Sequence, residues 1–423
     1  MTTFFLVIAP FFLIAPGLFQ SASTTPKALS IAVGLFLACR PGWRKAPQCA
    51  TQVLVFLGIC VISFFYAVDP FTAFAGCPKS PYFGIYQLAM VAGAYYAASA
   101  SGQDDRNRAT TVILARLGAC LGAFAVVQFV TVHSFLDRPL QLGRAEGFRY
   151  SPVMFAASLI PCALCAWDEI DLDSRLSRWL IFALIVAGML AAQAKGAIFA
   201  TIVGIWVYET EGWKRWGGVA AAMAVLYSYM FTFPTPTNLE RIELLKIAWR
   251  AFKVYPILGW GPDSFLVAFL NLDTTAYARI VSTVHAQASA HQDIAQVAAT
   301  LGLAGLAAYL WLLWSLVKAS EATPLSIACL VAIWLQSNVN PIPVDVLVVG
   351  ALLVGASHGT DEDIVFPSWI GPVILAIGVL LAIKDFRPRQ RMAVEIPAQV
   401  KSQYEPVMLE HDGLTPAGAI RAR

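Results

Sequence analysis

The sequence predicts an all-α polytopic membrane protein with about 12–13 transmembrane helices, and two observations support this prediction. First, 58% of the 423 residues are hydrophobic and only 13% are charged, whereas a soluble domain carries about 25% charged residues. Second, long apolar segments recur along the whole chain. Helices are the expected spanning elements because the bilayer core leaves no water to satisfy backbone polar groups.

Thirteen apolar segments are candidate spans, although several are shorter than the roughly 20 residues that a spanning helix needs. The region 179–208 holds two spans only if both are tilted or begin in the interface, so twelve spans are as consistent with the pattern as thirteen. No basic region precedes the first segment, which favours a membrane helix over a cleaved signal peptide. The segments are residues 4–20, 23–39, 51–68, 82–100, 110–132, 152–167, 179–194, 196–208, 217–233, 291–317, 324–339, 343–357 and 368–384.

Basic residues lie in alternate loops and predict a cytoplasmic N-terminus by the positive-inside rule. The loops 133–151 and 233–290 then face the periplasm. Thirteen spans would place the basic residues after 384 outside, so either one candidate is not a full span or the tail breaks the rule. We predict a membrane domain over 1–384 and a polar, disordered tail over 385–423. The basic residues in the predicted cytoplasmic loops are Arg40, Arg44, Lys45, Arg106, Arg108, Arg175, Arg178, Lys214, Arg215 and Lys318.

The composition excludes some function classes. The net charge is +3 and no basic block is present, so no nucleic-acid partner is expected. The eight cysteines show no Cys-x-x-Cys or Cys/His spacing, which favours small buried hydrophobes over metal ligands. The acidic stretch 358–363 is interpreted as a solvated loop.

The larger outer loop begins with a predicted helix over 239–253. Arg241 leads a helical column of apolar residues and therefore points towards packed protein. An interfacial amphipathic helix with a snorkelling Arg241 remains the alternative. Pro256 predicts that the helix ends near Tyr255. A separate basic column of this helix contains Lys246, Arg250 and Lys253.

His291 leads a column of small residues, which let membrane helices approach closely. His291 is therefore expected at the outer end of a helix face packed into the bundle. It is either a hydrogen-bonded interface residue or a functional group, since ionisable residues beside membrane segments usually lie in wet cavities. His285, in a polar loop, is expected to be solvated. The small residues are Ala295, Ala298, Gly302 and Gly305.

The outer loop 133–151 concentrates Arg138, Arg144 and Arg149. Guanidinium groups grip phosphate or pyrophosphate through paired donors, and contact with lipid headgroups is the alternative. Lys195 is a further isolated outer charge between two short apolar runs.

Three motifs, in this order, resemble the O-antigen ligase and polymerase superfamily of bacterial membrane glycosyltransferases. GRAEGFRYSPVMFAASL (143–159) places the family's first arginine on Arg144. RIELLKIAWRAFKVYPILGWG (241–261) places its second arginine on Arg241, and HQDIAQVAATLGLAG (291–305) places its catalytic-type histidine on His291. AAQAKGAI resembles the family's Ser-Arg-Gly-Ala turn with Lys195 in the basic position. The chain departs from the family pattern at Ser151, Leu245 and Gln292.

The resemblance implies a C-type glycosyltransferase-like bundle with a large periplasmic loop, acting at the outer face of the bacterial inner membrane without metal or cofactor. Its donor is a glycan on undecaprenyl pyrophosphate. The acceptor is a sugar hydroxyl on another repeat unit or on lipid A core, or a protein side chain. His291, with the near-neutral pKa of a histidine, would be the general base. Arg241 and Arg144 would hold the leaving pyrophosphate, and Arg149, Lys195 and Gln292 would bind substrate.

Two other function classes are compatible with an apolar, polytopic chain. A transporter or flippase of lipid-linked glycans would place ionisable residues at mid-membrane, where Arg116 stands alone. A structural membrane protein would leave the arginines and His291 of the outer loops unexplained. If the protein is a transferase, its departures from the family pattern at Ser151 and Gln292 slightly favour polymerisation of a surface polysaccharide over ligation.

Overall fold

The computed structural model describes most of the chain, including all of the candidate spans in whole or in part. The described residues are 4–12, 24–38, 46–77, 84–99, 105–132, 143–147, 151–168, 175–233, 235–272, 274–280, 284–320, 323–358, 360–361, 370–385, 404–405 and 419–422.

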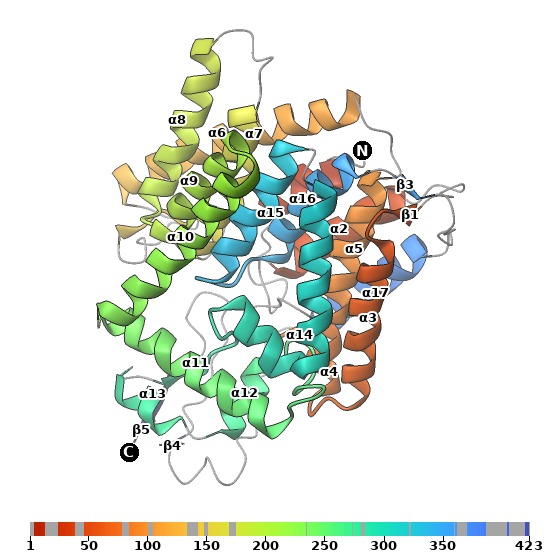
Figure 1. Cartoon of the computed structure of the whole chain (residues 1–423), viewed down its shortest axis with the longest axis vertical. Coiled ribbons are helices and arrows are strands. Elements are labelled where there is room, and N and C mark those ends of the chain that lie inside the picture. Colours follow the sequence, from red (N-terminus) through yellow and green to blue (C-terminus); the bar gives the residue numbers. More distant parts are fainter. Residues whose placement is uncertain are drawn as a thin grey trace.

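The described part of the chain is almost entirely helical, which confirms the all-α prediction (Figure 1). Each predicted apolar segment coincides with at least one helix. The helices are the π-helix η1 Phe4–Ile8, α1 Ala9–Phe12, α2 Thr24–Ala38, α3 Ala50–Phe65, α4 Pro70–Ala75, α5 Ile85–Ser99, α6 Asp105–Thr131, α7 Pro152–Asp168, α8 Arg175–Ala191, α9 Lys195–Glu209, α10 Gly212–Thr232, α11 Pro236–Val254, α12 Phe265–Asn271, α13 Thr275–Ile280, α14 Asp293–Ser320, α15 Pro324–Ser337, α16 Val344–Ser357 and α17 Ile370–Asp385.

Five very short strands complete the described structure. β1 Ala46–Pro47 pairs antiparallel with β3 Thr360–Asp361. β5 Ala419–Ala422 pairs antiparallel with both β2 Val284–His285 and β4 Tyr404–Glu405. The described residues of the C-terminal tail therefore lie against the loop that precedes His291. The predicted division at residue 385 stays a prediction.

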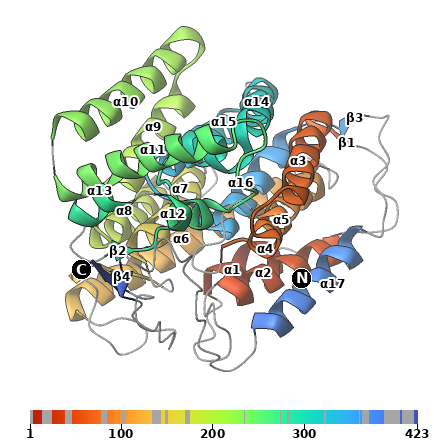
Figure 2. The ribbon, with the colours of Figure 1, turned by 90° about the horizontal axis from the view of Figure 1, so that it is seen from below.

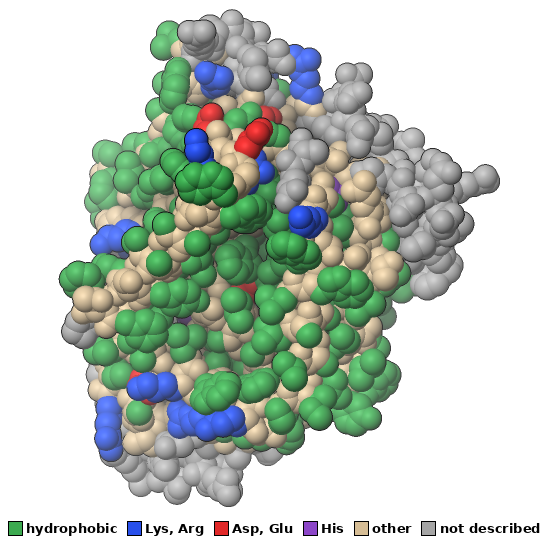
Figure 3. All heavy atoms as spheres, in the orientation of Figure 1, with side chains coloured by type: hydrophobic (Ala, Val, Ile, Leu, Met, Phe, Trp, Pro, Cys, Tyr) green, Lys and Arg blue, Asp and Glu red, His purple; other side chains and the backbone are tan. Residues whose placement is uncertain are grey.

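A largely hydrophobic surface covers the middle of the molecule, and charged side chains gather towards its two ends (Figure 3). Within the described residues, Arg108–Thr131 and Asp293–Ser320 are long and apolar enough to cross a bilayer, and α10 with α11 would be a third span if this pair, bent by 103°, is counted as one. Seven further apolar helices have 10–17 residues. At about 1.5 Å per residue these are shorter than the roughly 30 Å hydrocarbon core. The described residues thus contain two or three helices long enough to span a bilayer, and the predicted 12–13 spans stay a prediction.

α7 forms the centre of the largest core. It packs against α6, α8, α9 and α15, and its side chains are buried from Phe155 to Ala166. A helix that is apolar on all sides is expected in the interior of a bundle. Helices α11, α12 and α13 gather at one end of the bundle (Figures 1 and 2), and this end carries the candidate site.

α14 is broken at Gly302, whose backbone adopts φ 64° and ψ −162°. The turn at residues 256–261 fills the break. Leu303 N–H and Ala304 N–H donate to the carbonyls of Pro256 and Ile257 at 2.8 and 3.1 Å. The N–H groups of Trp260 and Gly261 donate to the carbonyls of Ala299 and Thr300 at 3.3 and 2.9 Å. The turn thereby satisfies backbone groups that a break inside a membrane helix would leave unpaired.

The break changes the interpretation of the small-residue column below His291. Ala295 and Ala298 lie before the break and Gly305 lies after it, so the column is not one continuous helix face. The close approach at Gly302 is made by the turn instead of a neighbouring helix. A Cβ atom on Gly302 would lie 2.4 Å from the carbonyl carbon of Ile257.

Gly302→Ala is expected to lower the stability of the protein by at least about 2 kcal/mol, because alanine combines a strained positive φ with a backbone clash. The midpoint of thermal unfolding in detergent measures this loss. Gly58→Ala in α3 is the matched control, since a Cβ there meets no atom within 4 Å and alanine favours a helix over glycine. Equal unfolding midpoints for the two variants would show that the break tolerates a side chain.

Candidate functional site

α11 places Arg241 on the inner side of the outer loop. Thr235 caps the helix by accepting a hydrogen bond from Asn238 N–H at 3.3 Å, and Pro236 occupies the first turn, where its missing N–H costs nothing. The helix ends at Val254, as the predicted end near Tyr255 requires. Arg241 is half-buried, and its Nη2 donates to Asn340 Oδ1 at 3.3 Å. The orientation towards packed protein is therefore confirmed.

His291 lies just before α14 in a left-handed backbone conformation, with φ 54°. Non-glycine residues adopt this region at a cost of about 1–3 kcal/mol, and such strain clusters at functional sites. Two hydrogen bonds hold the strained segment. His291 N–H donates to Ser289 Oγ at 3.0 Å, and Ala290 N–H donates to the fully buried Gln296 Oε1 at 2.8 Å. These two bonds hold the backbone at His291, and the backbone sets the direction in which its side chain leaves.

Asn340 joins His291 to Arg241. Its Oδ1 accepts from Arg241 Nη2, and its amide lies beside the imidazole of His291, whose pKa it raises. Asn340 therefore lies beside both His291 and Arg241.

The pKa of His291 is lowered from the usual 6.5 to about 4. Burial lowers it most, the nearby positive charge of Arg241 lowers it further, and the hydrogen bond with Asn340 partly raises it. Part of the imidazole surface is still accessible, but the protein around the ring replaces most of its hydration. This lowered pKa differs from the near-neutral value expected from the sequence, because that expectation contained neither the burial nor the adjacent guanidinium.

His291, Arg241 and Gln292 line one pocket, which holds about 400 Å³ of empty space, part of it open to solvent. Gln292 is engaged on both ends of its amide. Its Nε2 donates to Tyr227 OH at 2.8 Å and to Asn338 Oδ1 at 3.0 Å, while its Oε1 accepts from Ala295 N–H at 2.5 Å. Gln292 therefore caps α14 and ties it to α10 and to the end of α15.

Arg144 lies outside this pocket, against the end of α8. Its Nε donates to the carbonyl of Ala192 at 3.0 Å and its Nη2 to that of Gln193 at 3.4 Å. Carbonyl groups at a helix C-terminus carry partial negative charge, which a guanidinium stabilises. Burial lowers the pKa of Arg144, although a guanidinium stays charged at neutral pH. Gln128 fixes the same loop by bonding both the N–H and the carbonyl of Gly147.

Lys195 is exposed and begins α9 directly after the turn that Arg144 holds. A Cβ atom on the next residue, Gly196, would lie 3.0 Å from Gln336 Oε1 and 3.6 Å from Asn340 Nδ2. The N-terminus of α9 therefore abuts the amide that links His291 and Arg241. Two positive features thus adjoin Asn340: Arg241 and the N-terminal end of the α9 dipole.

Three predicted residues are not placed. Arg138 and Arg149 lie outside the described residues, and of His285 the structure describes only the backbone, in β2.

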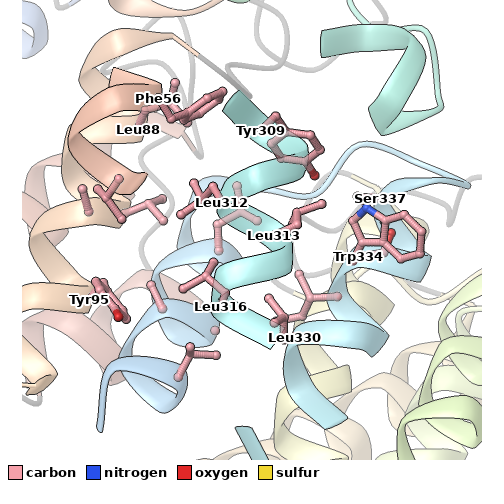
Figure 4. Close-up of a pocket in the computed structure, with 18 of the residues that line it drawn as sticks. Phe56, Leu88, Tyr95, Tyr309, Leu312, Leu313, Leu316, Leu330, Trp334 and Ser337 are labelled. Atoms are coloured by element: carbon pink, nitrogen blue, oxygen red, sulfur yellow. The ribbon is translucent and has the colours of Figure 1, made fainter. Parts of the chain in front are cut away.

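A long apolar cavity begins beside the site and runs along the second half of α14 (Figure 4). It holds about 1030 Å³ of empty space, including space open to solvent. Asp293 and Ser337, the sequence neighbours of Gln292 and Asn338, line its near end, and Asp293 accepts a hydrogen bond from Tyr309 OH. The remaining wall is almost wholly apolar and includes Phe56, Leu88, Leu312, Leu316 and Leu330.

Residues 179–310 match the model of the O-antigen ligase family. This segment is similar to the O-antigen ligase family. The matched segment contains Lys195, Arg241, His291 and Gln292, whereas Arg144 precedes it. No curated protein matches the chain. The O-antigen ligase family implies a membrane enzyme of glycosyltransferase type that acts on a lipid-linked glycan and an acceptor.

The sequence interpretation missed Asn338, which lines the pocket, and Asn340, which accepts from Arg241. A signal was present, because residues 336–341 read QSNVNP between two apolar segments. Such a polar run at a membrane boundary is equally typical of a solvated loop and of a functional site. Nothing in the sequence shows that it meets an arginine 99 positions away.

Proposed function

We propose that this protein transfers or polymerises an undecaprenyl-pyrophosphate-linked glycan at the periplasmic face of the inner membrane. The observation that supports this proposal is that His291 and Arg241 line a single pocket, with the charge of Arg241 close enough to lower the pKa of His291. A neutral base beside a fixed guanidinium suits a reaction in which a hydroxyl loses a proton while a pyrophosphate departs.

In the proposed reaction, His291 takes the proton of the acceptor hydroxyl. The acceptor oxygen forms a bond to the anomeric carbon of the donor, and the bond from that carbon to the pyrophosphate oxygen breaks. The electron pair stays on the undecaprenyl pyrophosphate. Arg241 stabilises the developing charge, and Lys195 and the N-terminus of α9 add positive charge on the other side of Asn340. Arg144 supports this side by holding the 192–193 carbonyls.

The low pKa of His291 fits a substrate-assisted base. In the free enzyme the imidazole is neutral at pH 7 and therefore ready to accept a proton. A bound pyrophosphate would offset the field of Arg241 and raise the pKa of His291 towards the working pH. His291 would thus become a stronger base only when the donor is bound. In the free enzyme it would stay unprotonated.

The apolar cavity along α14 suits the hydrocarbon tail of the donor. Asp293 and Ser337, which line the cavity, are the sequence neighbours of Gln292 and Asn338, which line the polar pocket. A lipid pyrophosphate with its head at Arg241 and its first isoprene units along Leu312 and Leu316 would use both spaces. A carrier with a much shorter tail should therefore bind more weakly.

Transfer by purified protein in detergent tests the proposal. We expect glycan transfer from a lipid-linked donor, undecaprenyl pyrophosphate as the product, and full activity in EDTA. The transporter alternative requires sealed vesicles and forms no new glycosidic bond. A requirement for Mg²⁺ or Mn²⁺, or direct use of a nucleotide sugar, would contradict the mechanism. In a deletion strain, single repeat units on the acceptor or carrier indicate a polymerase, whereas long polymer stranded on the carrier indicates a ligase.

As the pH is lowered from 8 to about 5, kcat/KM is not expected to fall through protonation of His291. Because the folded pKa is depressed to about 4, the active neutral form persists until the pH approaches that value. Initial rates at low donor concentration measure this profile. A fall centred near 6.5 would show that His291 titrates as an ordinary exposed histidine.

Impermeant thiol labelling of intact spheroplasts tests the proposed orientation. Lys246→Cys is expected to react because its loop faces outwards, whereas Trp213→Cys is expected to react only after lysis. Both positions are exposed. The exposed Cys120 must first be replaced, while Cys77 is buried. The opposite labelling pattern would contradict the orientation and, with it, the periplasmic reaction.

A further inference from the structure

A second pocket lies where α7 and α9 end and α8 begins, at the end of these helices remote from His291. It holds about 560 Å³ of empty space, part of it open to solvent. The sidedness follows from α9, whose first turn lies beside Asn340 at Gly196 and which ends in this pocket at Glu209. The other side chains that matter here are Trp167, Arg178, Trp179, Phe182 and Tyr208.

The aromatic rings of the pocket are held in place by carboxylates. Trp167 Nε1 donates to Glu209 Oε1 at 2.8 Å, and Tyr208 OH donates to Asp168 Oδ1 at 2.8 Å. The ring centroid of Trp167 lies 5.5 Å from that of Trp179 at an interplanar angle of 87°. A carboxylate accepts about four hydrogen bonds, so Glu209 keeps acceptor capacity for a ligand.

The pocket contains groups suited to both charges of a zwitterion, one set for an ammonium and one for a phosphate. Tryptophan faces attract alkylammonium groups, and Glu209 adds a negative charge beside them. Arg178 supplies a guanidinium for phosphate oxygens, and its Cζ lies 5.9 Å from the ring centroid of Trp179. A ligand with an ammonium and a phosphate a few ångströms apart would engage both halves.

The surface next to the pocket favours a lipid over a soluble zwitterion. On α8, Leu176, Trp179 and Leu180 are 79%, 49% and 58% exposed. These apolar side chains would lie along acyl chains, and exposed tryptophan is typical of the membrane interface. We propose that this pocket binds the headgroup of a zwitterionic phospholipid, with its ammonium at Trp179 and Glu209 and its phosphate at Arg178.

Lipid retention in native mass spectrometry tests this proposal without any glycan substrate. The purified protein is reconstituted into discs of equal phosphatidylethanolamine and phosphatidylglycerol, and the retained lipid is identified after release. We expect one zwitterionic lipid to be retained preferentially. Glu209→Gln keeps an acceptor for Trp167 Nε1 but removes the charge, so it should lower this preference about tenfold. Trp179→Leu should act similarly.

Matched controls are Glu211→Gln and Trp213→Leu, which alter exposed residues near the same end of α9 and should leave retention unchanged. Discs with phosphatidylcholine in place of phosphatidylethanolamine distinguish the ammonium types, and retention of either lipid supports the proposal. Preferential retention of phosphatidylglycerol, or a preference unaffected by Glu209→Gln, overturns it. If Trp179→Leu lowers the thermal unfolding midpoint, the Glu209→Gln result decides.

Discussion

His291→Ala is expected to lower kcat for glycan transfer about 10²- to 10⁴-fold, because it removes the general base. His291→Asn should be as inactive, and it separates chemistry from backbone strain, since asparagine tolerates the left-handed conformation of this position. Initial rates of purified variants measure both losses. His285→Ala, in the same outer loop, should be mild.

The amount of membrane-inserted protein should be similar for all these variants. Near-normal transfer by His291→Asn would show that His291 only supports the loop and that another group accepts the proton.

Arg241→Ala is expected to lower kcat about 10²- to 10³-fold, the loss typical when one transition-state donor is removed. Arg241→Lys should be nearly as damaging, because a single ammonium cannot reproduce the paired donors of a guanidinium. Since Asn340 contacts both Arg241 and His291, the double variant Arg241→Ala/His291→Ala should lose far less than the product of the single losses.

Lys246→Ala and Arg250→Ala are matched controls on the same helix and should stay close to the parent rate, because these residues belong to its other, basic column. Arg241→Lys also has a readout besides activity. A mobile ammonium should place less charge near the imidazole, so NMR titration is expected to find a higher pKa for His291. Full activity of Arg241→Lys would contradict the proposed leaving-group clamp.

Much of this fold follows from the sequence, because apolar segments must become helices in a bilayer and their ends are marked by polar residues, glycine and proline. The end of α11 next to Tyr255 illustrates this, since Pro256 acts on its immediate neighbour. The inward orientation of Arg241 was equally predictable from its apolar column. The C-type architecture and the sidedness of the loops stay predictions.

The rest of the site depends on contacts between distant segments, which periodicity does not encode. The small-residue column of His291 reads as one helix face, yet the chain breaks at Gly302 because the turn at 256–261 supplies alternative hydrogen bonds. Gln292 fits a substrate-binding residue by position, but its amide caps α14 and bonds Tyr227 and Asn338. The depressed pKa of His291 likewise arises from burial and from Arg241, not from the residue type.

The turn at 256–261 also has a mechanical consequence. Its four backbone hydrogen bonds fasten the chain just after α11 to both sides of the break in α14, so we expect the two helices to move together. A change in the tilt of α14, as when bilayer thickness varies, would carry α11 with it. The spacing between the base and the guanidinium would then be preserved, while the width of the apolar cavity beside α14 changes. Lipid environment would therefore alter the fit of the donor's tail before it disturbs the reacting groups.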